Sequence, residues 1–226
     1  MLCRQKIQDV AKVIVSFTDS YVQNKQRKQN EQSESESTLS LAQVTSRLEY
    51  LFGQIQNKQS CKQVIRIPKL LQSLIALVTF RLGTHLREQT DLLRLEVRRQ
   101  SRECLRYIQV YGDEQIQSEF VNNGYGRAIF LSFCTAGGIG EEQDVEIWNG
   151  LWQISVFLRK LLEGRNYQPS FQPLPLLVLR SDEQIEEEGA NEELEAQMKN
   201  KGYDGDILDQ AKAVKATTLN HFINWD

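Results

Sequence analysis

Apolar residues recur at helical spacing along most of this 226-residue chain. The first such segment covers residues 4–23, where apolar positions three or four residues apart predict an amphipathic helix. No apolar residue lies between Val22 and Leu39, and serine alternates with glutamate in the second half of that interval. A solvated linker rich in Gln, Ser and Glu is therefore predicted over residues 24–38.

Beyond the linker, long amphipathic segments alternate with short, strongly apolar ones. Long helices are predicted over residues 39–56, 88–110 and 144–163, and the short apolar segments cover residues 68–80, 126–134 and 174–179. In the third long helix the apolar residues recur at steps of four and three, which is the clearest helical pattern in the chain. Pro68 is predicted to open the first short helix, because proline suits the first helical position. An acidic stretch over residues 181–200 and a last helix over residues 206–222 complete the chain.

Convincing strands are almost absent from this pattern, so the predicted fold class is all-α. A long amphipathic helix, then a short polar segment and then a short apolar one recur about every fifty residues. A helical unit of this size cannot bury its apolar face alone, whereas stacked neighbours share a continuous core. The repeat therefore predicts a short α-solenoid of about three helical repeats.

The repeat resembles a known family. Four segments carry this resemblance to the armadillo repeat: Arg99–Ile108, Asp113–Gly124, Ala128–Leu131 and Glu142–Trp152. In that family a long third helix is followed by a short first helix that ends in a glycine turn, and then by a second, apolar helix. The resemblance is clearest over residues 94–164, weaker over residues 40–93 and faint beyond residue 165. It implies a right-handed armadillo-like superhelix that binds proteins, without indicating a particular ligand.

One departure from the family pattern concerns the grip on extended peptides. Armadillo proteins that clamp such peptides usually carry a Trp and an Asn four residues apart on the third helix, whereas here Trp148 is followed by Trp152. The adjacent Asn149 lies at a different angular position on the helix. An importin-like grip is therefore not implied, and about three units are too few for the long groove of a cargo receptor.

Together these patterns divide the chain into four parts. They are an N-terminal helix over residues 1–23, the polar linker over residues 24–38, an armadillo-like helical repeat domain over residues 39–180, and an acidic segment plus C-terminal helix over residues 181–226.

The net charge of -3 hides a segregation of basic and acidic residues. Residues 1–30 carry six Lys or Arg against two Asp, whereas residues 181–200 carry eight acids against one Lys. This balance argues against a general nucleic-acid binder, whose phosphate contacts need a broad basic excess, but it leaves room for a local basic face. The longest uncharged apolar run, Leu70–Phe80, is eleven residues long and too short for the roughly 20 residues of a membrane span. No nucleic-acid or membrane partner is expected.

Residues that usually carry catalysis or bind metals are sparse. The four cysteines lie far apart, and neither His85 nor His221 has a carboxylate or nucleophile at motif spacing. The segment Cys134–Asp144 contains three glycines, yet acids follow where a phosphate loop needs lysine and serine or threonine. The favoured interpretation of this segment is a hinge between two helices, with its acids at the start of the second helix. No enzymatic activity, metal or cofactor is predicted, and the rival hypothesis is an enzyme whose chemistry the sequence does not display.

One stripe of the helix predicted over residues 88–110 consists of arginine at every fourth position: Arg94, Arg98, Arg102 and Arg106. Two interpretations are open: a solvated face paired with acids of the same helix, or a basic strip that binds an acidic protein segment through bidentate guanidinium contacts. The same chain also contains an acidic segment, residues 182–195. Three interpretations of it are open: it is solvated surface, it folds back on the arginine strip, or it attracts a basic partner. The residues of this helix expected to face inward are Leu92, Leu95, Cys104, Leu105 and Ile108.

Trp148 and Trp152 are one turn apart on the helix predicted over residues 144–163. Aromatic residues at this spacing either belong to the core or anchor a partner on the concave surface that third helices line in armadillo proteins. Both interpretations are open at this point.

The function that follows from these observations is that of a non-enzymatic scaffold or adaptor that mediates protein–protein interactions. We expect it to be a subunit of a larger assembly, with the cytoskeleton as one setting, in which the arginine stripe steers a protein partner carrying an acidic segment and the tryptophans anchor it. The alternatives are a regulator of a small GTPase or kinase and a structural subunit of an enzyme complex. A cytoplasmic location is expected, and a mitochondrial one is the weaker alternative because Asp9 interrupts the amphipathic start.

Overall fold

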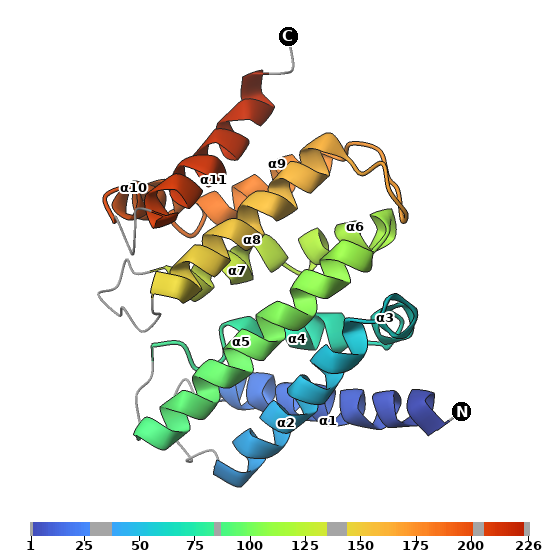
Figure 1. The fold of residues 1–226 in the computed structure, drawn as a ribbon. Helices are drawn as coiled ribbons and strands as arrows, with labels where there is room; N and C mark the ends of the chain where they lie inside the picture. The colour runs from blue at the N-terminus through green and yellow to red at the C-terminus, as the bar shows by residue number, and fades with distance from the viewer. Residues whose placement is uncertain (1, 28–37, 84–86, 135–143, 201–205, 224–226) are drawn as a thin grey trace. The chain divides into compact units, whose positions relative to one another are not determined.

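The computed structural model describes residues 2–27, 38–83, 87–134, 144–200 and 206–223 (Figure 1). This part of the chain contains eleven α-helices and no strand, and one isolated bridge joins Arg165 to Phe171. The helices are α1 (Leu2–Arg27), α2 (Thr38–Ile55), α3 (Lys58–Ile65), α4 (Leu70–Val78), α5 (Glu88–Tyr111), α6 (Glu114–Asn122), α7 (Tyr125–Phe133), α8 (Asp144–Glu163), α9 (Pro175–Glu186), α10 (Ala190–Gln197) and α11 (Asp206–Ile223). The all-α class predicted from the sequence is confirmed for the described residues.

The chain forms two compact units, Met1–Gly112 and Asp113–Asp226. In the first unit the long helix α5 packs against α2, α3 and α4, and α1 packs against the same three helices. Each of the five helices contributes apolar side chains with no more than 1% exposure, among them Ile14, Leu48, Cys61, Leu74 and Leu105. The core of this unit therefore lies between α1 and α5, with α2, α3 and α4 as its walls.

In the second unit α8 packs against α7, α9 and α11, while α6 packs on α7 and α9. An aromatic cluster joins three of these helices, because the Tyr125 ring lies edge-on to Phe120 at a centroid distance of 4.5 Å and to Phe157 at 4.9 Å. Such edge-to-face contacts add to the apolar area that the rings bury. α10 completes the unit by contacting α9 and α11.

Local sequence signals explain where several of these helices begin and end. The Asn57 carboxamide oxygen caps α3 by accepting hydrogen bonds from the Gln59 and Ser60 amides, and the Asp113 carboxylate caps α6 by accepting from the Ile116 amide. Gly124 joins α6 to α7 with a φ of 71°, in the left-handed region where glycine carries no steric penalty.

The long helices predicted from periodicity are confirmed within a residue or two as α2, α5 and α8, and the last predicted helix as α11. The N-terminal helix is longer than predicted, because α1 runs from Leu2 to Arg27. The linker predicted over residues 24–38 therefore overlaps the end of α1 and the first residue of α2, while residues 28–37 lie outside the described residues.

One local prediction is wrong, and one helix was not predicted. Pro68 does not open a helix: α4 begins at Leu70, because Lys69 adopts a left-handed φ of 62° that an α-helix cannot contain. α3 has no counterpart in the prediction, since only Cys61 and Val64 of its eight residues are buried and the apolar pattern is too short to recognise.

The helices that follow α2 repeat one order of lengths. Two short helices precede a long one three times, with 8, 9 and 24 residues in α3–α5, 9, 9 and 20 in α6–α8, and 12, 8 and 18 in α9–α11. The third set includes the predicted acidic stretch, which covers the second half of α9 and all of α10. The superhelical stacking of these sets, and the domain boundaries at residues 39 and 181, stay predictions.

Candidate protein-binding surfaces

The arginine stripe of α5 is mostly buried. Arg94, Arg98 and Arg102 have exposed fractions of 3%, 3% and 1%. The Arg98 Nη1 atom donates a hydrogen bond to the backbone carbonyl oxygen of Phe80 at 3.3 Å, and Arg94 Nη1 lies 3.5 Å from the Asp91 carboxylate. The expectation of an exposed stripe, whether solvated or open to an acidic segment, is therefore wrong for these three residues.

This burial follows from the register of α5. Leu92, which the apolar pattern placed inward, is 60% exposed, whereas Thr90, Val97 and Ser101 are buried on the same helix as the arginines. Arginine can bury its long aliphatic stem while its guanidinium reaches a backbone carbonyl group, so a charged residue does not have to face outward. Further along the helix the prediction is correct, because the inward-facing residues there are Cys104, Leu105 and Ile108.

Arg106 ends the stripe in a partly exposed position. Its Nη2 atom lies 2.8 Å from the Glu103 carboxylate, and its guanidinium lies 4.5 Å from the centroid of the Tyr107 ring. Burial tends to lower the pKa of Arg106, but the hydrogen bond and negative charge of Glu103, together with Tyr107, raise that pKa above its ordinary value. The binding role assigned to the four arginines stays a prediction, and among the four only Arg106 offers a partly exposed side chain.

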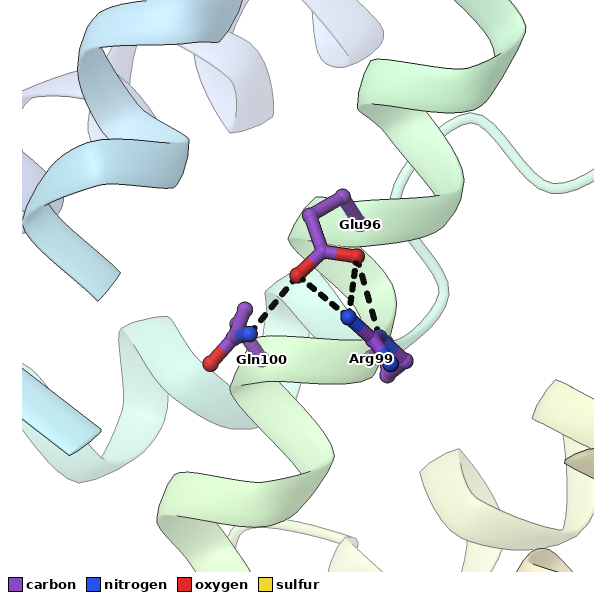
Figure 2. Close-up of polar contacts among 3 residues, drawn as sticks. All are labelled: Glu96, Arg99 and Gln100. Carbon is purple, nitrogen blue, oxygen red and sulfur yellow. Dashed lines mark hydrogen bonds and ion pairs between the residues drawn. The ribbon is translucent and has the colours of Figure 1, made fainter. Parts of the chain in front are cut away.

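A second polar group on α5 consists of Glu96, Arg99 and Gln100, whose side chains interact with one another (Figure 2). Arg99 Nη2 lies 2.8 Å from the Glu96 carboxylate, which also accepts a hydrogen bond from Gln100 Nε2 at 2.7 Å. Burial acts to raise the pKa of Glu96, but the hydrogen bonds from Arg99 and Gln100 and the charge of Arg99 outweigh it and lower the pKa. These charges are therefore satisfied within one helix and do not point to a ligand.

The acidic segment over residues 182–195 lies in α9, in α10 and in the turn between them, and it is not wholly solvated. Asp182 is 5% exposed and Glu193 is 1% exposed. The Glu193 carboxylate accepts a hydrogen bond from Gln197 Nε2 at 2.8 Å and lies 3.5 Å from the Cys134 thiol, which donates to it. Solvated surface is therefore wrong as an interpretation of these two acids. That the segment folds back on the arginines stays a prediction.

The tryptophan pair of α8 lies at the margin of the core. The Trp148 and Trp152 rings are stacked, with centroids 6.3 Å apart and planes within 9° of parallel. Both side chains are half-buried, whereas Ile147 and Leu151 of the same helix are buried. Each tryptophan is thus partly in the core and keeps part of its surface open, and the role of the pair as an anchor for a partner stays a prediction.

Two cysteines of the first unit, Cys61 and Cys104, are buried. Burial raises the pKa of Cys61 to about 12, and it raises the pKa of Cys104 further, with the charges of Glu103 and Cys61 adding to the effect. Thiols with raised pKa values are poor nucleophiles and metal ligands, because the reactive form is the thiolate. Within the described ranges no group of three or more His, Cys, Asp or Glu residues could hold a metal ion.

Two features singled out in the sequence cannot be placed. The glycines predicted to form a hinge, and the acids that follow them up to residue 143, lie outside the described residues, as does His85. His221 belongs to α11. None of the helices in the described part of the chain has both the length and the apolar character needed to cross a membrane.

The structure also shows a groove that sequence analysis did not identify. It has a volume of about 720 Å³ and lies between α1 and the segment formed by α3 and the turn after it. Four of its lining residues are cations, namely Arg4, Lys12, Lys62 and Arg66, and no lining residue is acidic. The basic excess of residues 1–30 was the available signal, but two of the four cations come from α3 and its C-terminal cap, a helix that the apolar pattern did not predict.

Comparisons with models of protein families, with curated proteins and with solved structures found no match to this chain. The armadillo resemblance therefore rests on the residues and the helix order described above, and it stays a prediction.

Proposed function

We propose that this protein is a non-enzymatic scaffold or adaptor of armadillo-like helical repeats, which binds other proteins as a subunit of a larger assembly. The observation that carries the proposal is the stacked, half-buried pair of Trp148 and Trp152 on α8. Tryptophan brings a large apolar area with few rotatable bonds, so a partly open pair suits the anchor of an interface.

The surroundings of the pair support this role. Val145, three residues before Trp148 and so on the same side of α8, is 64% exposed. An exposed apolar side chain one turn before two half-buried aromatic rings adds to the apolar surface on this side of α8, and exposed apolar surface is what a protein partner covers. The repeated order of two short helices and one long helix also supports the proposal, because it makes α8 the third helix of its set, the helix that lines the concave surface in armadillo proteins.

The proposal is tested by affinity isolation of the full chain with quantitative mass spectrometry, in three forms: unaltered, Trp152→Ala, and Leu92→Ala as a control. Leu92 is an exposed apolar residue of the other unit, at 60% exposure. Truncating an interface anchor costs roughly 2 kcal/mol or more, which is a loss of at least tenfold in affinity. We expect Trp152→Ala to lose a defined set of proteins that the unaltered chain and Leu92→Ala both retain.

Folding is monitored in parallel, so that a loss of partners is not a loss of structure. The circular dichroism of the Trp152→Ala variant should keep its helical signal, because the side chain is only half-buried. Retention of the same proteins by all three forms would contradict the anchor, and saturable nucleotide binding by the unaltered chain would contradict the non-enzymatic role.

A further inference from the structure

We propose that the groove between α1 and α3 binds an acidic segment of a partner protein. This inference rests on the proposed protein-binding function, but it concerns a different surface in the first unit of the chain. The sequence predicted that the arginine stripe binds an acidic segment, and this inference assigns that role to the exposed cations of the groove instead.

The groove brings together polar stripes from two helices. Arg4, Gln8 and Lys12 are spaced four residues apart on α1, so they lie along one side of that helix. Lys62 and Arg66 have the same spacing on α3 and its C-terminal cap. Because α1 and α3 are in contact, cations from both helices surround one volume. All four cations are exposed.

Most of this positive charge has no anionic partner among the residues that the structure describes. Lys12 has a loose ion pair with Asp9 at 3.9 Å, in which both side chains are largely exposed. For Arg4, Lys62 and Arg66 no ion pair or hydrogen bond of the side chain exists among the described residues. Like charges around one groove repel one another, and an anionic partner relieves that repulsion while electrostatic attraction speeds its approach.

The other lining residues favour a peptide over other anions. Gln8, Gln59 and Gln63 present amides, which both donate and accept hydrogen bonds, as the backbone of a peptide requires. Val15, Ile67 and Pro68 add apolar surface for a side chain between the acids. A single-stranded nucleic acid needs aromatic platforms for its bases, and none of the groove's lining residues is aromatic. A bilayer surface is too broad to enter a concave site of this size.

The dimensions set the length of the segment. The α1 side of the groove runs from Arg4 to Ser16, which is about 18 Å along a helix that rises 1.5 Å per residue. An extended chain covers that distance in about five or six residues. The partner segment is therefore short, with acidic residues at both ends and an apolar residue near the middle.

The test is fluorescence anisotropy with the full chain and a labelled ten-residue peptide in which glutamates flank a central pair of leucines. The groove variant is Arg4→Gln/Lys62→Gln/Arg66→Gln, and the control is Arg159→Gln/Lys199→Gln/Lys212→Gln. The control removes the same charge from exposed residues of the other unit. Glutamine keeps the helix propensity of both sets, so folding is preserved, and circular dichroism verifies it.

We expect the peptide to bind the unaltered chain and the control within twofold of each other, and the groove variant at least tenfold more weakly. Replacing glutamate by glutamine in the peptide should abolish binding. Equal losses in the groove and control variants would overturn the proposal. So would tighter binding of a ten-nucleotide single-stranded DNA, or of phosphatidylserine vesicles, that depends on the same three residues.

Failure of this inference is distinguishable from failure of the proposed function. Trp152 belongs to the second unit, so Trp152→Ala should bind the acidic peptide as the unaltered chain does. Loss of peptide binding in Trp152→Ala would contradict a groove formed by α1 and α3, whereas the anchor itself is judged by the affinity isolation alone.

Discussion

Arg98 joins α5 to the turn that follows α4 by donating a hydrogen bond from Nη1 to the backbone carbonyl oxygen of Phe80 at 3.3 Å. Arg98 is 3% exposed and Phe80 is fully buried. Phe80 also holds α1, because its ring packs against Phe17 at 5.4 Å and against Tyr21 at 4.8 Å. One charged side chain thus satisfies a carbonyl group at the point where three helices of the first unit meet.

We predict that Arg98→Ala destabilises the chain by about 2–3 kcal/mol, because it leaves a buried carbonyl without its donor and removes the packed stem. Arg98→Met keeps most of the stem and should lose about 1 kcal/mol less. The measurement is chemical denaturation followed by circular dichroism. Arg99→Ala is the matched control on the exposed side of α5 and should cost less than about 1 kcal/mol. An Arg98→Ala variant as stable as Arg99→Ala would show that the buried hydrogen bond does not matter.

A second prediction concerns the turn after α8. Gly164 has a φ of 73°, and a Cβ atom there would meet the Phe171 carbonyl oxygen at 2.7 Å. Gly164→Ala should therefore cost about 3 kcal/mol or more, since both the left-handed backbone and the contact with another backbone segment oppose it. Gly124→Ala is the control: it has a similar φ of 71° but nothing within 4 Å of the added atom. Thermal unfolding should separate the two variants by several degrees.

If the two glycine variants unfold together, the contact with Phe171 contributes nothing and only the backbone conformation counts. The same experiment tests the small loop that Gly164 closes. In that loop Arg165 is buried beneath the Phe171 ring, 4.8 Å from its centroid, and its amide donates to the Phe171 carbonyl oxygen at 2.8 Å. Burial lowers the pKa of Arg165, although the nearby Tyr167 and Asp113 partly offset the effect.

Periodicity was sufficient to predict the long helices, because α2, α5 and α8 each carry three or more turns of apolar residues on one side. It was insufficient for α3, because this helix has only eight residues, two of them buried, and its apolar pattern is too short to stand out. Lys69 shows a different limit, since lysine, unlike glycine or asparagine, gives no indication of a left-handed backbone. Proline suits the first position of a helix, but the backbone between α3 and α4 places Pro68 before the helix instead.

The surfaces were harder to predict than the helices. Binary patterning assigns arginine to solvent, so it could not anticipate that Arg94, Arg98 and Arg102 are buried while Leu92 is exposed. The tryptophan pair was found from spacing alone, but spacing does not tell how much of each ring stays open. The groove depends on the packing of α1 against α3. The apolar pattern of one helix does not tell which other helix it packs against.

A third prediction tests the close approach of α7 and α8. A Cβ atom on Gly150 would lie 2.4 Å from Cδ1 of the buried Phe133 ring. Gly150→Ala should therefore destabilise the chain by about 1–2 kcal/mol, because overpacking outweighs the roughly 1 kcal/mol that alanine gains in a helix. In a Phe133→Ala background the ring is gone, and the same substitution should become neutral or stabilising. A double-mutant cycle measures this change of sign, and additive effects would show that Gly150 and Phe133 do not interact.

The last prediction concerns alkaline pH and the buried thiols. A cysteine thiol ionises near its ordinary pKa of 9.0 in the unfolded chain, whereas burial raises the pKa of Cys61 to about 12 in the folded chain. Between these values the unfolded form releases a proton that the folded form keeps, so stability is intact below pH 9 and falls as pH rises toward 12. The expected slope is up to ~1.4 kcal/mol per pH unit for one thiol.

Urea denaturation at a series of pH values measures this slope, and a Cys61→Ala/Cys104→Ala variant provides the comparison. Lysines and tyrosines also titrate in this range, but their contribution is common to both proteins, so the difference in slope belongs to the two thiols. The double variant should therefore lose less stability per pH unit above pH 9.

Alkylation gives an independent measure, because a native thiol that stays protonated reacts slowly with iodoacetamide at pH 8 and reacts freely once urea unfolds the chain. Equal slopes in the two proteins, or rapid alkylation of Cys61 in the native chain, would contradict the burial described for α3.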